Sequence, residues 1–386
     1  MSASGAFVYV QHLLGIGHLK RAATLARALS AQGLRVTLAS GGAAVAGLAM
    51  DGVDFVQLPP AYAADASFKT LLDENGREVD EAWKRRRGAA LLEAWHAAKA
   101  QVLVIELYPF GRRQMRFELL PLLEAASAAP RRATIVCSVR DILGAQQNRE
   151  RQEETLALLG RYFDRVLVHG DPGVVSFEQT FPAAERIARQ ITYTGYIVDP
   201  DDAPSGDAGK GEVIVSAGGG AVGAPILEAA IRARPLCSLK DRTWRILAGN
   251  NLPDTEFRRL AQLARAQERV ELERSRPDFT TLLANSTLCI SQAGYNTLME
   301  TIRARARAVV VPFAGGRESE QTLRARCFAA RGLLELVEEA ALTPQALAAA
   351  VDRAARKAKP APQAIDLDGA GKSAALIGRW TGRRPE

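Results

Sequence analysis

Residues 15–21 combine glycines, a histidine and two basic side chains in a pattern that suits phosphate binding and proton transfer. Gly15 and Gly17 precede His18, and Lys20 and Arg21 follow in what we expect to be the opening turn of a helix. Glycines let a phosphate approach the backbone closely, and a helix start offers free N–H groups and a positive dipole end. His18 is therefore a candidate general base, or a hydrogen-bond donor to an anion. A tight turn that carries a surface histidine is the alternative interpretation.

A second glycine-rich segment, SAGGGAVG, spans residues 216–223. No Gly-Lys-Ser/Thr triplet follows it, so it is not a P-loop, and no suitably spaced acidic residue completes a dinucleotide fingerprint. Successive glycines before a helix suit a pyrophosphate, and they are costly in conformational entropy. We therefore expect Gly218, Gly219, Gly220 and Ala221 to contact phosphate, with a flexible turn as the alternative.

A third segment, SQAGYNTLME, covers residues 291–300. Gly294 is expected to lead from a strand into a helix, and Glu300 lies almost two turns into that helix. A carboxylate that faces a ligand there can accept hydrogen bonds from two ribose hydroxyls. Farther along, Arg317, Glu320 and Gln321 lie at the start of the next helix, where an acid beside an amide can bind sugar hydroxyls. The alternatives are a solvated helical glutamate and acids that simply favour a helix N-terminus.

Polar residues also follow apolar stretches in the first half of the chain. Glu106 is a second candidate base, and Arg112 and Arg113 after it are candidates for binding a phosphate or carboxylate. Asp141, next to Arg140, is a third catalytic candidate. Structural ion pairs would explain these residues about equally well.

Short apolar runs alternate with longer amphipathic stretches along the chain. Runs rich in Val, Ile and Leu are typical of parallel strands that are covered on both faces. The expected strands are residues 7–11, 34–40, 102–107, 133–139, 165–169, 212–216, 244–248, 269–272, 288–291 and 308–311. The expected helices are residues 19–32, 81–100, 112–126, 149–162, 221–233, 255–266, 279–284, 297–305, 319–331 and 372–380.

The segment 198–211 is rich in Asp, Pro and Gly and reads as a linker between domains. The pattern predicts an α/β protein of two doubly wound, Rossmann-like domains that face a cleft. The expected domains are residues 1–198 and 212–368, and a last helical segment, residues 369–386, is expected to pack back on the first. Ligands of such sheets bind beyond the carboxyl ends of the strands, where the candidate loops lie.

Composition narrows the function classes. The chain has 386 residues, with 50 Lys and Arg against 43 Asp and Glu, so the net charge is +7. No basic tail and no basic stretch interleaved with aromatic rings is present, which argues against a nucleic-acid partner. The four cysteines are scattered, so neither a zinc site nor a disulfide framework is expected. No apolar run is long enough to cross a membrane and no signal peptide is evident, so a cytoplasmic location is expected.

Residues 83–95, WKRRRGAALLEAW, combine basic residues with an apolar stripe. Such a helix can dock on an anionic membrane surface, which would make the protein peripheral at the inner membrane face. A solvated helix with one face in the core is the favoured interpretation.

The second half of the chain resembles the nucleotide-sugar-binding domain of GT-B glycosyltransferases, most closely the family-28 group. That group includes the bacterial UDP-N-acetylglucosamine transferase that completes the lipid-linked peptidoglycan precursor. In that family a glutamate six residues after a strand-end glycine grips the nucleotide ribose, and here Gly294 plus six is Glu300. The family's acid–Gln pair before a helix corresponds to Glu320 and Gln321, with Ala325 four residues on, and its phosphate loop corresponds to residues 218–221. The remaining donor-binding residues implied by the resemblance are Leu272 and Glu273, whose backbone would hold the uracil base, and Ser291, Asn296 and Thr297.

The first half matches the family's opening glycine loop through residues 15–18. Two departures stand out. The motif G-I-G-H-L-K-R is closer to that of nucleotide-sugar hydrolases with the same fold, and the family's His-Glu-Gln-Asn segment is replaced by residues 138–141, Ser-Val-Arg-Asp. The second departure puts the peptidoglycan acceptor in doubt.

The resemblance implies an inverting, metal-independent glycosyltransferase that needs no cofactor. Its donor would be a UDP-sugar, with UDP-N-acetylglucosamine as one candidate, and its acceptor is unidentified, a membrane-associated one remaining open. His18 would deprotonate the acceptor hydroxyl or hold charge near the donor phosphate. A hydrolase in which His18 activates water, and a non-catalytic sugar-nucleotide-binding protein, are the alternatives.

Overall fold

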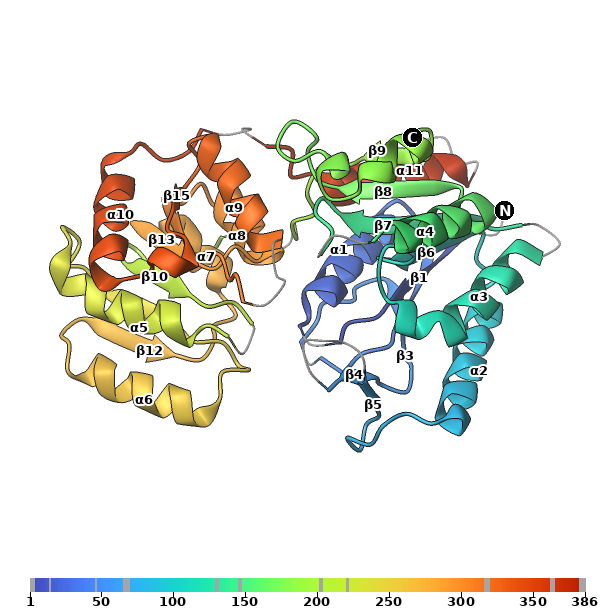
Figure 1. Cartoon of the computed structure of the whole chain (residues 1–386), viewed down its shortest axis with the longest axis horizontal. Coiled ribbons are helices and arrows are strands. Elements are labelled where there is room, and N and C mark those ends of the chain that lie inside the picture. Colours follow the sequence, from blue (N-terminus) through green and yellow to red (C-terminus); the bar gives the residue numbers. More distant parts are fainter. Residues whose placement is uncertain are drawn as a thin grey trace. The chain divides into compact units, whose positions relative to one another are not determined.

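The computed structural model describes residues 4–13, 15–45, 47–64, 70–128, 132–144, 148–200, 204–219, 222–315, 320–361 and 365–381. The chain forms two units, of which the first comprises Met1–Ile197 and Asp366–Glu386 and the second Val198–Ile365. Each unit is built on a parallel sheet flanked by helices (Figure 1). The expected fold class, two Rossmann-like α/β domains, is therefore confirmed.

The first unit contains a seven-stranded parallel sheet in the order β3-β2-β1-β6-β7-β8-β9. Strand β1 pairs with both β2 and β6, so that Val8 lies opposite Leu38 on one side and Val104 on the other. The order of connection reverses at β1, which makes the carboxyl ends of β1 and β6 the switch point of this sheet. The strands are β1 (Gly5–Val10), β2 (Arg35–Ser40), β3 (Val53–Gln57), β6 (Val102–Glu106), β7 (Thr134–Arg140), β8 (Arg165–His169) and β9 (Ile191–Tyr193).

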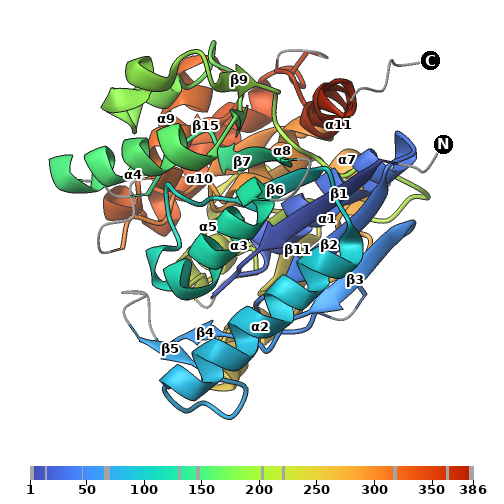
Figure 2. The same ribbon diagram turned by 90° about the vertical axis from the view of Figure 1, so that its right-hand side faces the viewer.

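Alternate residues of β1 enter two different cores, as the twofold period of a strand dictates. Phe7 and Tyr9 pack in the cluster that contains helices α2 (Glu81–Ala98) and α3 (Arg116–Ala128). Ala6, Val8 and Val10 pack in the cluster that contains α1 and the last helix. Figure 2 shows α2 crossing in front of β1–β3. The remaining helices are α1 (Gly17–Ala31), α4 (Arg149–Tyr162) and α11 (Gly369–Trp380).

Helix α11 belongs to the first unit although it ends the chain. It lies against α1, and Ala370, Ala374 and Ile377 contribute its buried face. Small residues on this face let the two helices approach closely. The segment from Asp366 onward therefore returns to the first sheet.

The second unit contains a six-stranded parallel sheet in the order β12-β11-β10-β13-β14-β15. Its switch point lies between β10 and β13, since β10 pairs with both β11 and β13. The strands are β10 (Val213–Ser216), β11 (Trp244–Leu247), β12 (Val270–Glu273), β13 (Leu288–Ser291), β14 (Ala308–Val310) and β15 (Glu335–Leu336). The helices are α5 (Ala224–Ala233), α6 (Asp254–Arg265), α7 (Phe279–Asn285), α8 (Tyr295–Arg303), α9 (Glu320–Ala330) and α10 (Pro344–Arg356).

The structure adds elements that the sequence pattern did not predict and moves several boundaries, most of all the start of α3. Strands β3, β9 and β15, helix α10 and the short antiparallel pair β4 (Tyr62–Ala63) and β5 (Leu71–Leu72) are additional. Helix α3 begins at Arg116 rather than at Arg112, because Arg112 has a left-handed φ of 61° and a short 3-10 turn follows it. A left-handed residue cannot continue a right-handed helix.

Helix α2 turns its tryptophans inward. Trp83 and Trp95 are 3% and 5% exposed and lie in the core of the first unit. The apolar stripe of residues 83–95 therefore faces the protein, as the favoured interpretation predicted, and does not supply the apolar face that membrane docking needs. No helix in the described ranges combines the length and apolar character of a membrane span.

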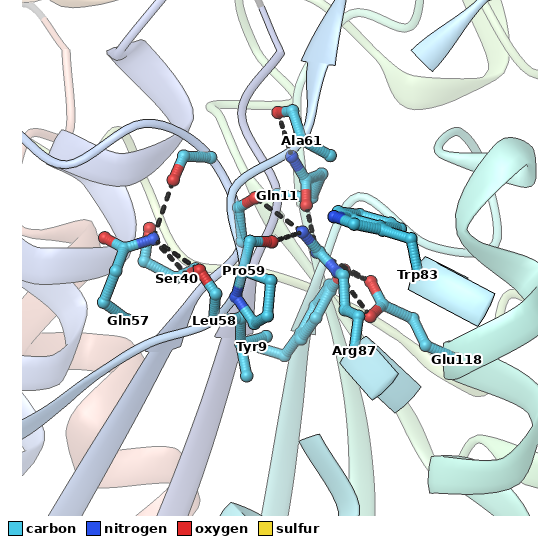
Figure 3. Close-up of polar contacts among 12 residues, drawn as sticks. Tyr9, Gln11, Ser40, Gln57, Leu58, Pro59, Ala61, Trp83, Arg87 and Glu118 are labelled. Atoms are coloured by element: carbon cyan, nitrogen blue, oxygen red, sulfur yellow. Dashed lines mark hydrogen bonds and ion pairs between the residues drawn. The ribbon is translucent and has the colours of Figure 1, made fainter. Parts of the chain in front are cut away.

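A buried ion pair between α2 and α3 fixes the loops that follow β1, β2 and β3 (Figure 3). Arg87 donates from Nε to Glu118 Oε2 at 2.7 Å and from Nη2 to Glu118 Oε1 at 2.9 Å, and both side chains are fully buried. The same guanidinium donates to Gln11 Oε1 and to the carbonyls of Gly41 and Pro59. Every donor in this fork has an acceptor, so the ends of three strands are held by one side chain.

Candidate functional site

The side chain of His18 lies against the end of β6. Helix α1 begins at Gly17, and the Nδ1 atom of His18 in its first turn is 3.0 Å from Oε1 of Glu106, the last residue of β6. One turn later, Arg21 forms an ion pair with the same carboxylate. The Glu106 and Arg21 side chains are each 2% exposed, whereas His18 is 14% exposed. Two of the three catalytic candidates, His18 and Glu106, are thus in direct contact.

Further polar side chains continue from Glu106 across the sheet. Ser138 of β7 donates from Oγ to Glu106 Oε2 at 2.5 Å. The same oxygen is 2.9 Å from Nε2 of His169 at the end of β8, and Nδ1 of His169 is 2.8 Å from Oγ1 of Thr194, which follows β9. All four residues are buried. Ser138, His169 and Thr194 were not predicted as site residues.

Burial and charge set the protonation states of this network. Burial lowers the pKa of His18 well below its usual range, and the charges of Arg140, Arg112 and Arg21 lower it further against the opposing hydrogen bond to Glu106. Burial by itself raises the pKa of Glu106, but the charge of Arg21 and hydrogen bonds from His18 and Ser138 outweigh it and bring this pKa below its usual range. At neutral pH the imidazole is therefore neutral and the carboxylate ionised.

An ionised carboxylate can only accept hydrogen bonds, and this places the proton of His18. Nδ1 of His18 is 3.0 Å from Glu106 Oε1 and 3.1 Å from Nη2 of Arg21, which pairs with the same carboxylate. We infer that Glu106 accepts from Nδ1–H of His18 while Arg21 donates to the carboxylate, so that the Nε2 atom of His18 keeps a lone pair. An imidazole oriented by a carboxylate through one nitrogen, with the other nitrogen unprotonated, has the arrangement of a general base. The proton positions are inferred from the hydrogen-bond network.

The basic residues predicted for this loop separate into two groups. Arg112 donates from Nε to the carbonyl of Gln11 at 2.8 Å, and burial together with the charge of Arg140 lowers its pKa to about 10. Arg113 instead forms a partly exposed ion pair with Glu154 of α4. Lys20 is exposed. Only Arg112 and Arg21 of the four therefore share the electrostatic environment of His18.

The other candidates at this edge have local roles. Asp141 is fully buried, and its Oδ1 atom accepts a hydrogen bond from the N–H of Ile142 at 2.9 Å, which shapes the turn after β7. Gly170 packs directly on it, since a Cβ there would lie 2.5 Å from the Asp141 Cβ. Gly15 is exposed, at the entrance to α1. His12, which sequence reasoning passed over, is also buried beside this loop.

The glycine loop of the second unit lies at that sheet's switch point. Gly218 adopts a left-handed φ of 69°, and its N–H is 3.2 Å from Ser216 Oγ. A Cβ at Gly218 would lie 3.8 Å from Oγ1 of Thr297, so the loop runs beside the start of α8. Asn251 donates to the carbonyl of Gly219 at 2.5 Å. Gly220 and Ala221 lie outside the described residues.

Helix α5 begins directly after this loop and helix α8 begins beside it, and neither has a side-chain cap at its N-terminus. Neither α5 nor α8 has a capping side-chain hydrogen bond or an acidic residue in its first turn, and α8 starts directly after Gly294. Such N-termini favour an anion. Asn296 and Thr297 lie in the first turn of α8 and Glu300 in the second, all half-buried, while Ser291 ends β13 and is buried.

The acid–amide pair of α9 divides its roles. Glu320 forms a buried ion pair with Arg324, whose Nη2 atom is 2.9 Å from Glu320 Oε1. Gln321 accepts from the N–H of Phe313 through Oε1 at 3.1 Å, which leaves its amide N–H₂ for a ligand. Gln321 is therefore the better sugar-binding candidate, and Glu320 serves the packing of α9. Arg317 lies outside the described residues.

Leu272 and Glu273, which are expected to contact the nucleobase, lie at the end of the edge strand β12. The side chain of Glu273 pairs with Arg245 of β11, and with Arg276 at 3.6 Å, while its carbonyl accepts from Ala248 N–H at 2.9 Å. Leu272 packs against the core. Neither residue presents an unused polar side chain, so any contact with a base falls to the backbone around them. In the described part of the chain, no group of three or more His, Cys, Asp or Glu is arranged to hold a metal ion.

Comparison with known proteins finds a family match over most of the second unit and the start of α11. Residues 214–375 match the family model described as the glycosyltransferase family 28 C-terminal domain. No curated protein sequence matches the chain significantly.

Solved structures with a similar fold cover nearly the whole chain. CalG4, the calicheamicin glycosyltransferase, superposes with a TM-score of 0.63 at 17% identity, over 100% of both chains. MurG of Acinetobacter baumannii gives a TM-score of 0.60 at 15% identity, over 97% of this chain and 99% of that one. Os79 of O. sativa, solved in complex with UDP, gives 0.61 at 14% identity, over 97% and 100%. At these identities the similarity establishes the fold.

Proposed function

We propose that this chain, which has the GT-B fold and whose residues 214–375 match the glycosyltransferase family 28 C-terminal domain, transfers a sugar from a UDP-sugar to an acceptor hydroxyl with inversion at the sugar carbon. The observation that carries the chemistry is the contact between Nδ1 of His18 and the buried carboxylate of Glu106, from which we infer a neutral imidazole whose Nε2 atom keeps its lone pair. The observation that supports the donor site is the glycine loop between two uncapped helix starts.

The second unit binds the donor in this proposal. The diphosphate lies against Gly218 and Gly219 and the N-termini of α5 and α8, where backbone N–H groups and helix dipoles favour negative charge. Glu300 accepts hydrogen bonds from the ribose hydroxyls. Gln321 donates its amide hydrogens to a hydroxyl of the transferred sugar. UDP is the first candidate, and the complex of a similar fold with UDP is consistent with it.

The first unit binds the acceptor and supplies the base. His18 Nε2 takes the proton of the acceptor hydroxyl as the acceptor oxygen bonds to the anomeric carbon and the bond from that carbon to the diphosphate breaks. The imidazolium that forms is stabilised by Glu106. Arg112 and Arg140 place positive charge near His18, which favours an acceptor that carries a phosphate or carboxylate. The leaving diphosphate's charge is offset by the helix dipoles of the second unit, so this step is written without a metal ion.

A hydrolase uses the same residues differently. If His18 activates water, a nucleotide sugar is consumed without an acceptor. The feature that favours a hydrolase is the motif G-I-G-H-L-K-R, which is closer to that of nucleotide-sugar hydrolases with the same fold.

The test measures release of nucleoside diphosphate from UDP-sugars by the full chain, with and without a pool of candidate acceptors. We expect release to rise when an acceptor is added, and His18→Ala to lower it about a hundredfold to ten-thousandfold while the nucleotide still binds. Release at full rate in water alone would identify the hydrolase. Unchanged turnover in His18→Ala would remove this histidine from the mechanism.

A further inference from the structure

The buried hydrogen-bond chain that starts at Glu106 leads away from the proposed base. It runs from Glu106 at the end of β6 through Ser138 in β7 and His169 at the end of β8 to Thr194, which follows β9, and these four strands are consecutive neighbours in the sheet. Glu106 and Ser138 are direct register partners. Neither His169 nor Thr194 has a role in the chemistry described above, yet both are conspicuous as polar groups inside an apolar sheet.

The chain of hydrogen bonds has one direction. Glu106 is ionised and accepts, so Ser138 must donate its hydroxyl proton to Glu106 and accept from Nε2–H of His169. His169 is neutral, because burial lowers its pKa to about 3, and its Nδ1 atom must therefore accept from Thr194. The Thr194 hydroxyl is also 3.1 Å from the carbonyl of Gly195, but donation there would turn an oxygen lone pair toward the lone pair of His169 Nδ1, so donation to Nδ1 fits the series. His18 and the buried His169 consequently carry their protons on opposite ring nitrogens.

The far end of this chain lies where the polypeptide passes between its two units. Thr194 is followed by Gly195, with a left-handed φ of 84°, on which the Asp366 carboxylate packs so closely that a Cβ would lie 2.5 Å from its Cγ. The N–H of Tyr196 donates to the Asp366 carbonyl at 2.8 Å. The chain leaves the first unit after Ile197 and re-enters it at Asp366. The hydrogen bond between Tyr196 and Asp366 therefore joins the two segments that connect the units.

We propose that Ser138, His169 and Thr194 are positioning residues, which hold Glu106 in the orientation that accepts Nδ1–H of His18 and tie that orientation to the paired crossing segments. The catalytic importance of this positioning depends on the proposed function, whereas the network itself is given by the hydrogen bonds. If these residues only satisfy one another's hydrogen bonds inside the sheet, they have no effect on the tautomer of His18. A positioning network and a purely structural one therefore differ in whether the tautomer of His18 changes when Thr194, at the far end, loses its hydroxyl.

Histidine spectroscopy separates them without any substrate. The chain has four histidines, at positions 12, 18, 96 and 169, so the imidazole nitrogens of the ¹⁵N-histidine-labelled full chain can be assigned by single His→Gln substitutions. At pH 7.5 we expect His18 to be in the Nδ1–H tautomer and His169 in the Nε2–H tautomer. His18 in the Nε2–H form would overturn the proposal.

Substitutions at the far end supply the decisive comparison. Thr194→Val removes the hydroxyl and Thr194→Ser keeps it, so we expect the His18 nitrogen shifts to move toward a tautomer mixture in the first and to stay in the second. Ser138→Ala should move them further. Ser40→Ala removes a buried hydroxyl at the end of β2 and serves as the control. If Ser138→Ala does not fold, the Thr194 pair decides, and unchanged His18 shifts in Thr194→Val overturn the proposal.

A rescue at position 169 adds a second check. The side-chain amide of His169→Gln can still donate to Ser138, whereas His169→Leu cannot, so only the latter should disturb His18. Where turnover of a UDP-sugar is measurable, His169→Leu should lower kcat by up to about a hundredfold and leave KM unchanged. Correct tautomers without turnover of any nucleotide sugar would refute the proposed function and leave the positioning network standing.

Discussion

One residue type performs different tasks in this protein because its surroundings differ. His18 lies at a helix start with one nitrogen held by Glu106, His169 is enclosed between two hydroxyls, and His96 is exposed on α2. The sequence pointed to His18 and Glu106 as separate candidates, because His18 follows one predicted strand and Glu106 lies at the end of another. Their pairing was not predictable, since 88 residues separate them. Ser138 and His169 were not predicted as site residues because they lie within apolar strands and no glycine marks them, although the segment 138–141 stood out as a departure from the family's pattern.

The lowered histidine pKa values make the first unit sensitive to acid. Between about pH 6.5 and pH 3 the unfolded chain protonates His169 while the folded chain does not, so stability falls as the pH falls through this window. A single proton changes the free energy of unfolding by about 1.4 kcal/mol per pH unit, which gives about 2 kcal/mol between pH 6.5 and 5. His18 adds to this loss in the same direction, and Glu106, with its lowered pKa, adds a further loss below about pH 4.3.

Urea unfolding at pH 5 and at pH 7.5 measures this effect. We expect His169→Gln to reduce the difference between the two pH values by about 2 kcal/mol. His96→Gln, which changes an exposed histidine, should leave the difference as in the wild type. If His169→Gln loses as much free energy of unfolding between pH 7.5 and pH 5 as the wild type does, His169 is not held neutral in the folded protein.

At the scale of elements, strongly apolar runs were predicted well and weak ones were not. Strands β8 and β13 have the predicted bounds, because a continuous buried run has no ambiguity of face. Strand β3 is an edge strand whose Phe55 is 42% exposed, so its pattern lacked the apolar density of the central strands. The start of α3 was wrong because the left-handed Arg112 depends on its hydrogen bond to Gln11, a contact 101 residues distant in sequence.

The Arg87–Glu118 pair is the element-scale device that holds the loops after β1 to β3 in place. Removing one partner leaves a buried uncompensated charge, so Arg87→Met should lower the free energy of unfolding by about 3–5 kcal/mol. The double substitution Arg87→Met, Glu118→Met removes both charges and should cost less than Arg87→Met alone. Urea unfolding followed by tryptophan fluorescence measures both, since Trp83 stacks on Arg87 at 5.3 Å. A double variant less stable than the single one would contradict this account of the ion pair.

At the scale of the whole molecule, two Rossmann-like units each place their candidate residues at a switch point. In the first unit this is the end of β1 and β6, and in the second the end of β10 and β13. The fold class follows from the alternation of strands and helices in the sequence. The return of α11 to α1 rests on an apolar face that a short C-terminal pattern only partly revealed. The roles of the two units, donor and acceptor binding, stay a proposal that ligand binding must decide.

The central claim is that the second unit binds the nucleoside diphosphate part of a sugar donor, and a thermal-shift panel on the full chain tests it most directly. UDP, dTDP, GDP and CDP would each be added with and without an attached sugar. A ligand at a hundred times its Kd stabilises the folded state by about 2.7 kcal/mol. We predict that UDP or a UDP-sugar raises the Tm by several degrees, that Glu300→Ala abolishes the rise, and that Glu268→Ala, which changes an exposed glutamate, retains it. A panel in which no nucleotide shifts the wild-type Tm, or one whose shift survives in Glu300→Ala, would contradict the account.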